Sequence, residues 1–211
     1  IFNNFNINNL IKKKKSIIAL QGNGSQKILE KIFQEYFNNL YFMENKCLVK
    51  NKLEICRCGY TGEDGFELYL DEIYAQEVYK YLVNYSQQNK KSNIQFGGLI
   101  ERDILRTEAG LNLSGSEFNH KLNIKFNSIN MPFLIDKKYR DNDLYKSNLS
   151  QKLFSSTKSI QKSSIFTCEN GKEKKIGFIT SSVKSFNLDK FIAIGYLDTT
   201  CNLNNIYVKG I

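Results

Sequence analysis

Hydrophobic and polar residues alternate over one short stretch in the first half of the chain. Phe66, Leu68 and Leu70 are apolar, and Glu67 and Tyr69 stand between them. A period of two predicts a half-buried β-strand. Glu67 is therefore expected on the face of the strand opposite Phe66 and Leu68.

A glycine-rich turn precedes this strand, with glycines at a spacing of three: Gly59, Gly62 and Gly65. Because glycine adopts positive φ without steric cost, residues 61–65 predict a tight turn that leads into the strand. A carboxylate just beyond a rigid turn, here Glu67, can accept two parallel N–H donors from a ligand. The same pattern is typical of a hairpin with a solvent-exposed acidic tip, and spacing alone does not distinguish the two.

The other elements predicted in the first half are strands and helices. Residues 16–21 predict an apolar strand, and Ser25 is expected to cap the helix that follows it. Apolar residues recur along this helix at helical spacing, and we expect core positions at Ile28, Leu29, Ile32, Phe33, Tyr36 and Phe37. Paired strands and two further helices are then predicted, at residues 46–49, 52–58, 73–85 and 99 to about 110.

The second half of the chain predicts shorter elements. Residues 137–163 are rich in Lys, Ser and Asn and predict a linker or low-complexity insertion. Three short strands are predicted beyond it, at 165–168, 175–181 and 191–197. Such strands are typical of a small antiparallel barrel. The expected fold class is α+β, with mixed or antiparallel sheets and helices followed by this C-terminal β-barrel.

A net charge of +9 and a pI near 9.2 raise the question of nucleic-acid binding. Nearly all the positive charge is lysine, however, since the arginines are only Arg57, Arg102, Arg106 and Arg140. Recognition of bases and phosphates favours the guanidinium, and no predicted helix has a basic face interleaved with aromatic residues. We therefore expect no nucleic-acid partner. A mildly basic surface would suit an anionic cofactor tail and an acidic protein partner.

The cysteines and the histidine give no metal or redox motif. Five cysteines are an odd number, and Cys56 and Cys58 on one strand face cannot form a CxxC site. Reduced, partly buried thiols in an intracellular compartment are expected. With His120 as the only histidine, we expect no metal site and no histidine-dependent triad. No apolar run reaches the ~18 residues needed to span a bilayer, and no signal segment is visible.

Two longer strings of residues resemble one known family. Residues 58–70 read Cys-Gly-Tyr-Thr-Gly-Glu-Asp-Gly-Phe-Glu-Leu-Tyr-Leu. This run is similar to the Gly-Tyr-Thr-Gly-Glu-Asp-Gly-aromatic-Glu signature of the aminomethyltransferases, the T protein of the glycine cleavage system. Residues 97–113 are similar to that family's Gly-Leu-x-x-Arg-Asp-x-Leu-Arg-x-Glu-Ala-Gly block. Weaker similarity is found at 18–22, where Asn23 replaces the family's usual proline, and at 175–181 and 192–196.

The resemblance implies a domain organisation. Residues 1–136 would form part of the folate-binding aminomethyltransferase domain, 137–163 a linker, and 164–211 an incomplete C-terminal barrel. Members of the family are longer at both ends. We therefore expect the chain to be an internal or truncated portion of such a protein, and the fragment alone to be inactive.

The resemblance also implies an activity, which is transfer of an aminomethyl carbon from the lipoyl-carrying H protein to tetrahydrofolate. Folate would be a co-substrate, no metal would take part, and the location would be mitochondrial. Three residues match folate-contacting positions of the family. Glu67 would bind the amidine-like edge of the pterin, Tyr60 would pack beside the ring, and Arg102 would bind the anionic tail or orient it. Arg106 is supported only weakly.

The family's catalytic aspartate lies upstream of the matched region, so no catalytic residue is assigned in this chain. Two alternatives stay open. One is a folate-binding relative without this activity, of the tRNA-modification or iron–sulfur assembly type. That branch uses a Lys-Gly-Cys-Tyr-x-Gly-Gln-Glu string, which the chain lacks. The other is a non-catalytic scaffold that binds only the lipoyl carrier, although retention of Glu67 and Arg102 argues against it.

Overall fold

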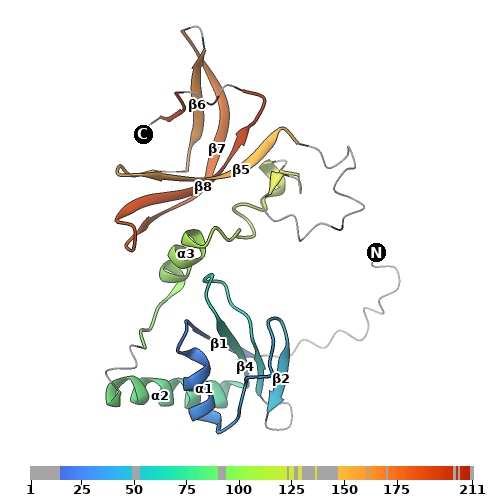
Figure 1. Ribbon diagram of the computed structural model, residues 1–211, viewed down its shortest axis with the longest axis vertical. Coiled ribbons are helices and arrows are strands. Elements are labelled where there is room, and N and C mark those ends of the chain that lie inside the picture. The colour runs from blue at the N-terminus through green and yellow to red at the C-terminus, as the bar shows by residue number, and fades with distance from the viewer. Residues whose placement is uncertain are drawn as a thin grey trace. The chain divides into compact units, whose positions relative to one another are not determined.

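The structure is a computed structural model, and two compact units make up the chain. The first comprises residues 1–59 and 63–96, and the second comprises residues 60–62 and 97–211. Most elements of both are labelled in Figure 1. The residues that the structure describes are 15–48, 53–89, 94–122, 124–125, 128–129, 136, 147–160, 162–169, 171–201, 203 and 205–209.

The first unit contains a four-stranded antiparallel sheet and two helices. Its strands lie in the order β1-β4-β3-β2, with bounds β1 Ser16–Gln21, β2 Asn45–Leu48, β3 Leu53–Cys56 and β4 Gly65–Leu70. The helices are α1 Ser25–Phe33 and α2 Glu72–Gln88. The predicted strands and helices of this region are thus confirmed, although β3 ends at Cys56 and leaves Cys58 outside the strand.

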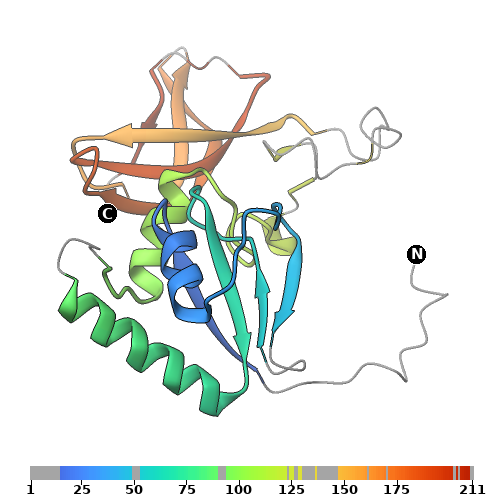
Figure 2. The same cartoon turned by 60° about the horizontal axis from the view of Figure 1, so that its bottom comes forward.

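One face of this sheet carries the hydrophobic core. Phe66, Leu68 and Leu70 of β4 are fully buried, and Leu68 pairs with Ile55 of β3 and Ile18 of β1 on the same face. Both helices cover this face, as Figures 1 and 2 show, and they contribute Ile28, Leu29, Ala75, Val78 and Leu82 to the same cluster. Alternation along β4 therefore sends apolar side chains to the core and Glu67 to the other face.

Helix α1 differs from the prediction at both ends. Gly24 occupies the N-cap position, and Ser25 is the first helical residue rather than the cap. The helix ends at Phe33, because Gln34 adopts a left-handed conformation with φ 54°. Phe37 still reaches the core, but Tyr36 is 81% exposed, so its predicted core position is wrong. The helical spacing of apolar residues in the sequence does not show at which residue the helix ends.

The second unit contains helix α3 and a five-stranded antiparallel sheet. Its strands lie in the order β5-β8-β7-β6-β9, with bounds β5 Leu149–Ser156, β6 Ser164–Glu169, β7 Lys172–Ser185, β8 Lys190–Asp198 and β9 Tyr207–Val208. Helix α3 spans Leu99–Glu108, and a 3₁₀ turn spans His120–Leu122. Within the described residues this antiparallel sheet has two edges, so the antiparallel strands are as expected and no closed barrel is found.

Strand β5 corrects the prediction of a linker over 137–163. It pairs with β8 along its whole length, from Leu149 opposite Asp198 to Ser156 opposite Phe191 (Figure 2). The strand has no alternating apolar face, since its buried residue is Gln151 while Leu153 is 65% exposed. Residues 137–146 of the predicted linker lie outside the described residues. The division into 1–136, 137–163 and 164–211 otherwise stays a prediction.

Helix α3 also departs from the apolar pattern of its sequence. Leu99 is 81% exposed and Ile100 is 74% exposed, whereas the buried residues of the helix are Arg106 and Thr107. The boundaries are as predicted, because Gly98 caps the start and Gly110 follows the end with φ +71°. A polar side chain can occupy the buried face only if every donor finds an acceptor, and this requirement is met around Arg106.

Candidate functional site

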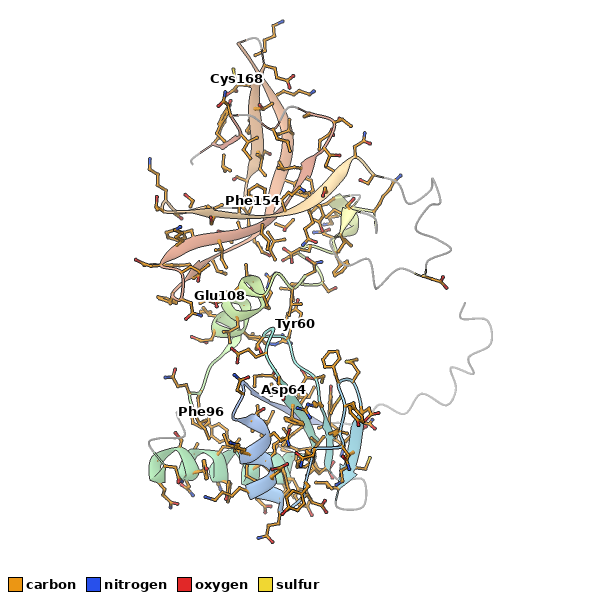
Figure 3. The ribbon with its side chains drawn as sticks, viewed as in Figure 1. Tyr60, Asp64, Phe96, Glu108, Phe154 and Cys168 are labelled. Carbon is orange, nitrogen blue, oxygen red and sulfur yellow. The ribbon has the colours of Figure 1, made fainter. Side chains whose placement is uncertain are left out.

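The first signature run lies on the eight-residue loop 57–64 between β3 and β4, on which Figure 3 labels Tyr60 and Asp64. An ion pair joins the two ends of this loop. The Arg57 guanidinium donates from Nε to Asp64 Oδ1 at 2.9 Å and from Nη2 to Oδ2 at 2.7 Å. These bonds lower the pKa of the Asp64 carboxyl below its ordinary value. Asp64 therefore shapes the turn by joining its two ends.

The amide of Gln21 also holds the two ends of the loop together. Its Nε2 donates to the carbonyl oxygens of Cys58 and Phe66, each at 3.2 Å. A β-carbon placed at Gly59 or at Gly65 would collide with this amide. A substitution at either of these two glycines would therefore require the Gln21 amide to move, and neither glycine has positive φ. The third, Gly62, does have positive φ, at +78°.

Glu67 is half-buried on β4, on the face opposite the core as predicted. Tyr69 lies two residues further along the same face and donates its hydroxyl to Glu67 Oε2 at 2.8 Å. The Cys58 thiol is close by, and burial, a hydrogen bond with Cys56 and the Glu67 charge raise its pKa to about 12. The thiolate form of Cys58 is therefore disfavoured at neutral pH.

Tyr60 and Arg102 lie together in the second unit. The Arg102 guanidinium carbon lies 4.9 Å from the centroid of the Tyr60 ring, which is a cation–π contact. The Tyr60 hydroxyl donates to the carbonyl oxygen of Asn112. Burial raises the pKa of Tyr60, so the phenol keeps its proton at neutral pH.

The two arginines of α3 have different roles. Arg102 is exposed and forms no ion pair with any residue in the described part of the chain. Arg106 is 1% exposed and bonds to Asp103 Oδ1 at 2.7 Å, Leu111 O at 3.1 Å, Glu117 Oε2 at 3.0 Å and Ser181 Oγ at 2.8 Å. Arg106 therefore has no capacity for a ligand, whereas Arg102 is available to an anion.

Of the three predicted site residues, the structure brings Tyr60 and Arg102 together, and Glu67 belongs to the first unit. Asn112, which accepts the Tyr60 hydroxyl bond, was not singled out from the sequence. It falls inside the second family block, but a backbone acceptor leaves no signal in residue types. Gln151 and Glu117, which surround it, have no sequence signal either, because isolated polar residues in a Ser- and Asn-rich region resemble surface positions.

A separate hollow of about 350 Å³ lies in the second unit, between the 115–122 segment and strands β6 and β7. Gly115, Asn119, Lys162, Lys175 and Phe178 are among its lining residues, and neither Tyr60 nor Arg102 is. No group of three or more possible metal ligands was found among the described residues. Likewise, no helix in the described part of the chain is long and apolar enough to cross a membrane.

The comparisons with known proteins agree with one another. Residues 5–138 match the GCVT N-terminal domain family. An aminomethyltransferase of Aquifex aeolicus is 32% identical over 187 residues, which are 86% of this chain and 49% of that protein. A mitochondrial aminomethyltransferase of Dictyostelium discoideum is 35% identical over 129 residues, which are 60% of this chain and 32% of that protein.

A solved structure shows the same fold. The glycine cleavage system aminomethyltransferase T from Bartonella henselae superposes with a TM-score of 0.75 at 23% identity, covering 93% of this chain and 55% of that one. The chain thus spans about half or less of the length of these relatives. The family match covers more than half of the chain, and it includes both signature runs. The chain belongs to the aminomethyltransferase family defined by the GCVT N-terminal domain.

Proposed function

We propose that the protein to which this chain belongs transfers an aminomethyl carbon from a lipoyl carrier, the H protein, to tetrahydrofolate. The carbon leaves the lipoyl sulfur and its own amino group and becomes bonded to two nitrogens of the folate. The two protons displaced from those nitrogens go to the sulfur and to the departing ammonia. The reaction is therefore balanced without an oxidant, a reductant or a metal.

The observation that carries this proposal is the cation–π pair of Arg102 and Tyr60, on the two runs that match the family. A guanidinium that has no ion-pair partner among the described residues, beside an aromatic ring, suits a ligand with a flat heteroaromatic body and a carboxylate tail. Glu67 would accept the two parallel N–H groups of the pterin edge, and its hydrogen bond from Tyr69 holds the carboxylate in one orientation. Tyr60, Glu67 and Arg102 are thus the proposed folate-binding residues.

Folate binding by this chain is proposed without turnover. The family's catalytic aspartate has no counterpart among the residues matched here, so no catalytic residue is proposed in this chain. Aminomethyl transfer by the 211-residue chain at ordinary enzyme concentration would contradict this part of the proposal.

The mitochondrial location also stays a proposal. Aminomethyltransferases similar to this chain come both from mitochondria, as in Dictyostelium discoideum, and from bacteria such as Aquifex aeolicus. Imaging of the tagged protein in its own cells would test the location directly. A signal spread through the cytosol would contradict it.

The direct test is a titration of the chain with 5-formyltetrahydrofolate by calorimetry, alongside the Glu67→Ala variant. Losing charge-assisted hydrogen bonds to the pterin edge should raise the dissociation constant about tenfold to a hundredfold. Glu77→Ala is the matched control, since Glu77 is an exposed acid on α2 and its loss changes the net charge equally. An unchanged dissociation constant in Glu67→Ala would remove the pterin anchor.

A second titration distinguishes the enzyme from a carrier-binding scaffold. A scaffold would bind the lipoyl H protein with the same affinity in wild type and in Arg102→Ala, and would not bind the folate at all. The proposed enzyme should bind folate, and Arg102→Ala should weaken it, because the variant removes the anion partner. Folate binding that does not differ between wild type and Arg102→Ala would withdraw Arg102 from the site.

A further inference from the structure

Residues 111–113 are held on both sides by one buried ion pair. Arg106 Nη1 donates to the carbonyl oxygen of Leu111 at 3.1 Å and to Glu117 Oε2 at 3.0 Å. The same Glu117 oxygen accepts the backbone N–H of Leu113 at 2.8 Å. The carbonyl of Asn112, which lies between these two fixed groups, is the acceptor of the Tyr60 hydroxyl.

The side chain of Asn112 is fixed by a different strand. Its Nδ2 donates to Gln151 Oε1 at 3.3 Å, and Gln151 Nε2 donates back to Asn112 Oδ1. Gln151 lies on β5 and is 7% exposed, and Asn112 is 6% exposed. Two amides that exchange both hydrogen bonds allow only one relative orientation. The peptide at Asn112 is therefore fixed by its side chain as well as by its neighbours.

The ion pair is in turn anchored on the sheet of the second unit. Glu117 is fully buried, and its Oε1 accepts the hydroxyl of Thr180 on β7 at 2.6 Å. Its backbone carbonyl accepts the hydroxyl of Tyr196 on β8 at 3.2 Å, and Arg106 Nη2 donates to Ser181 Oγ at 2.8 Å. Strand β7 thus satisfies the buried charges of the pair through Thr180 and Ser181, and β8 holds the backbone of Glu117 through Tyr196.

We propose that Arg106, Glu117 and Gln151 are positioning residues of the folate site, which fix the Asn112 carbonyl and thereby the Tyr60 phenol against Arg102. Helix α3 contributes to both ends of this arrangement, because Arg102 lies one turn before Arg106. The inference rests on the proposed function. It adds that Tyr60 is held ready for the ligand by a network that the ligand does not touch.

A role in positioning explains why charges are buried at this place. A buried ion pair stabilises a fold little compared with apolar residues of equal volume, because desolvation offsets the attraction. Such a pair does impose one geometry, since each of its partners must be met in direction as well as distance. The Arg106–Glu117 pair fixes the geometry of residues 111–113, which include the carbonyl that accepts the Tyr60 hydroxyl.

A double-mutant cycle tests the inference with the 211-residue chain and 5-formyltetrahydrofolate. Tyr60→Phe, Gln151→Ala and the double variant are titrated by calorimetry. Each single variant should raise the dissociation constant about threefold to tenfold, as the loss of one neutral hydrogen bond does. The double variant should bind no more weakly than Tyr60→Phe alone, because Gln151 acts only through the Tyr60 hydroxyl bond.

The outcomes separate this inference from the proposed function. If the wild-type chain does not bind the folate, the proposed function fails. If Tyr60→Phe leaves the dissociation constant unchanged, the positioning role fails alone, because phenylalanine keeps the ring that would pack beside the pterin. If Tyr60→Phe weakens binding and Gln151→Ala does not, or if the two effects multiply, the positioning role fails alone. Ser182→Ala is the control, since it loses a hydrogen bond to the Ile160 carbonyl on the same sheet and has no bond to residues 111–113. It should bind folate as wild type does.

A spectroscopic measurement covers the ion pair, whose truncation can unfold the unit. Glu117→Gln keeps the shape and one acceptor oxygen, and the chain is labelled with ¹³C at the ζ carbon of tyrosine. The Tyr60 resonance is assigned by its loss in Tyr60→Phe. Its chemical shift should move in Glu117→Gln and in Gln151→Ala, and stay in Ser182→Ala. An unmoved Tyr60 resonance in both of the first two variants would overturn the positioning role.

Discussion

The two units support their proposed folate-binding residues in different ways. Glu67 stands on a strand whose other face is a closed apolar core, in which Phe66 and Leu68 are 0% exposed. Tyr60 and Arg102 stand on a loop and a helix that buried polar groups hold in place, with Arg106 at 1% and Glu117 at 0% exposure. Apolar packing has no preferred direction, whereas a buried ion pair requires the position of every partner.

This difference leads us to expect different responses to substitution. A truncated apolar side chain in the first unit leaves a cavity, and its cost depends on how far the neighbours relax. Removing Glu117 in the second unit leaves the buried Arg106 guanidinium with the partly exposed carboxylate of Asp103 alone, and relaxation cannot supply a second carboxylate. The following substitutions test the contrast, from the largest expected effect to the smallest.

Glu117→Leu should have the largest effect. It leaves the buried Arg106 guanidinium without its fully buried carboxylate and should lower the free energy of unfolding by about 3–5 kcal/mol. Urea unfolding followed by circular dichroism measures the change. The double variant Arg106→Met, Glu117→Leu removes both charges and should recover most of the loss. A double variant no more stable than the single one would mean that hydrogen bonds to the sheet, rather than the charge pair, dominate.

Leu68→Ala should have the next largest effect, in the first unit. Leu68 is fully buried between Ile18 and Ile55, so the variant should lose about 2–4 kcal/mol of unfolding free energy through transfer and cavity terms. The same urea unfolding experiment measures it. Ile73→Ala is a control, because Ile73 is 72% exposed on α2 and should change stability little. A loss greater than that of Glu117→Leu would reverse the contrast between the units.

Gly65→Ala tests the glycine signature and should cost about 1–3 kcal/mol, as overpacking does. The added methyl would collide with the Gln21 amide. Gly24→Ala is the matched control, since a β-carbon at Gly24 meets nothing within 4 Å. In the background Gln21→Ala, the cost of Gly65→Ala should largely disappear because the colliding atoms are gone. An equal cost in both backgrounds would show that backbone conformation, and not this collision, selects glycine.

Asp64→Asn should have the smallest effect, about 0.5–1 kcal/mol, because the Arg57–Asp64 pair is partly exposed to solvent. The pKa of Asp64 is lower in the folded chain than its ordinary value, so the pair's contribution is fully present above the unfolded pKa. That contribution is lost as the pH falls through the folded pKa. The difference in stability between wild type and variant should thus be constant near neutral pH and shrink below about pH 4. A difference that grows in acid would contradict the ion pair.

The sequence predicted the first unit better than the second. Period-two alternation located β4 and placed Glu67 on its outer face, because an apolar core requires that alternation. Hydrophobic patterning did not identify the buried side of β5, where Gln151 is buried, or of α3, where Arg106 is buried. Hydrophobicity cannot identify a core built from paired polar groups, since those pairs form between residues far apart in the chain.

The proposed site follows the same division. Glu67, Tyr60 and Arg102 were named from their resemblance to the family, and the adjacency of Tyr60 and Arg102 emerged from the fold. Asn112, Glu117 and Gln151 were not predicted, because a hydrogen bond between residues 112 and 151 depends on the sheet that brings β5 to this place. The residue types near one position do not indicate a hydrogen-bond partner that lies far away in the sequence.

The amide of Gln21 makes the signature loop open as a single unit. Its Nε2 donates to the carbonyl of Cys58 and to that of Phe66, so one side chain joins both margins of the loop. We expect backbone amides within the loop to exchange with deuterium at one common rate rather than fraying from one end. Gln21→Glu would replace the amide donor by a carboxylate that faces the carbonyl oxygens of Cys58 and Phe66, and we expect the loop to open.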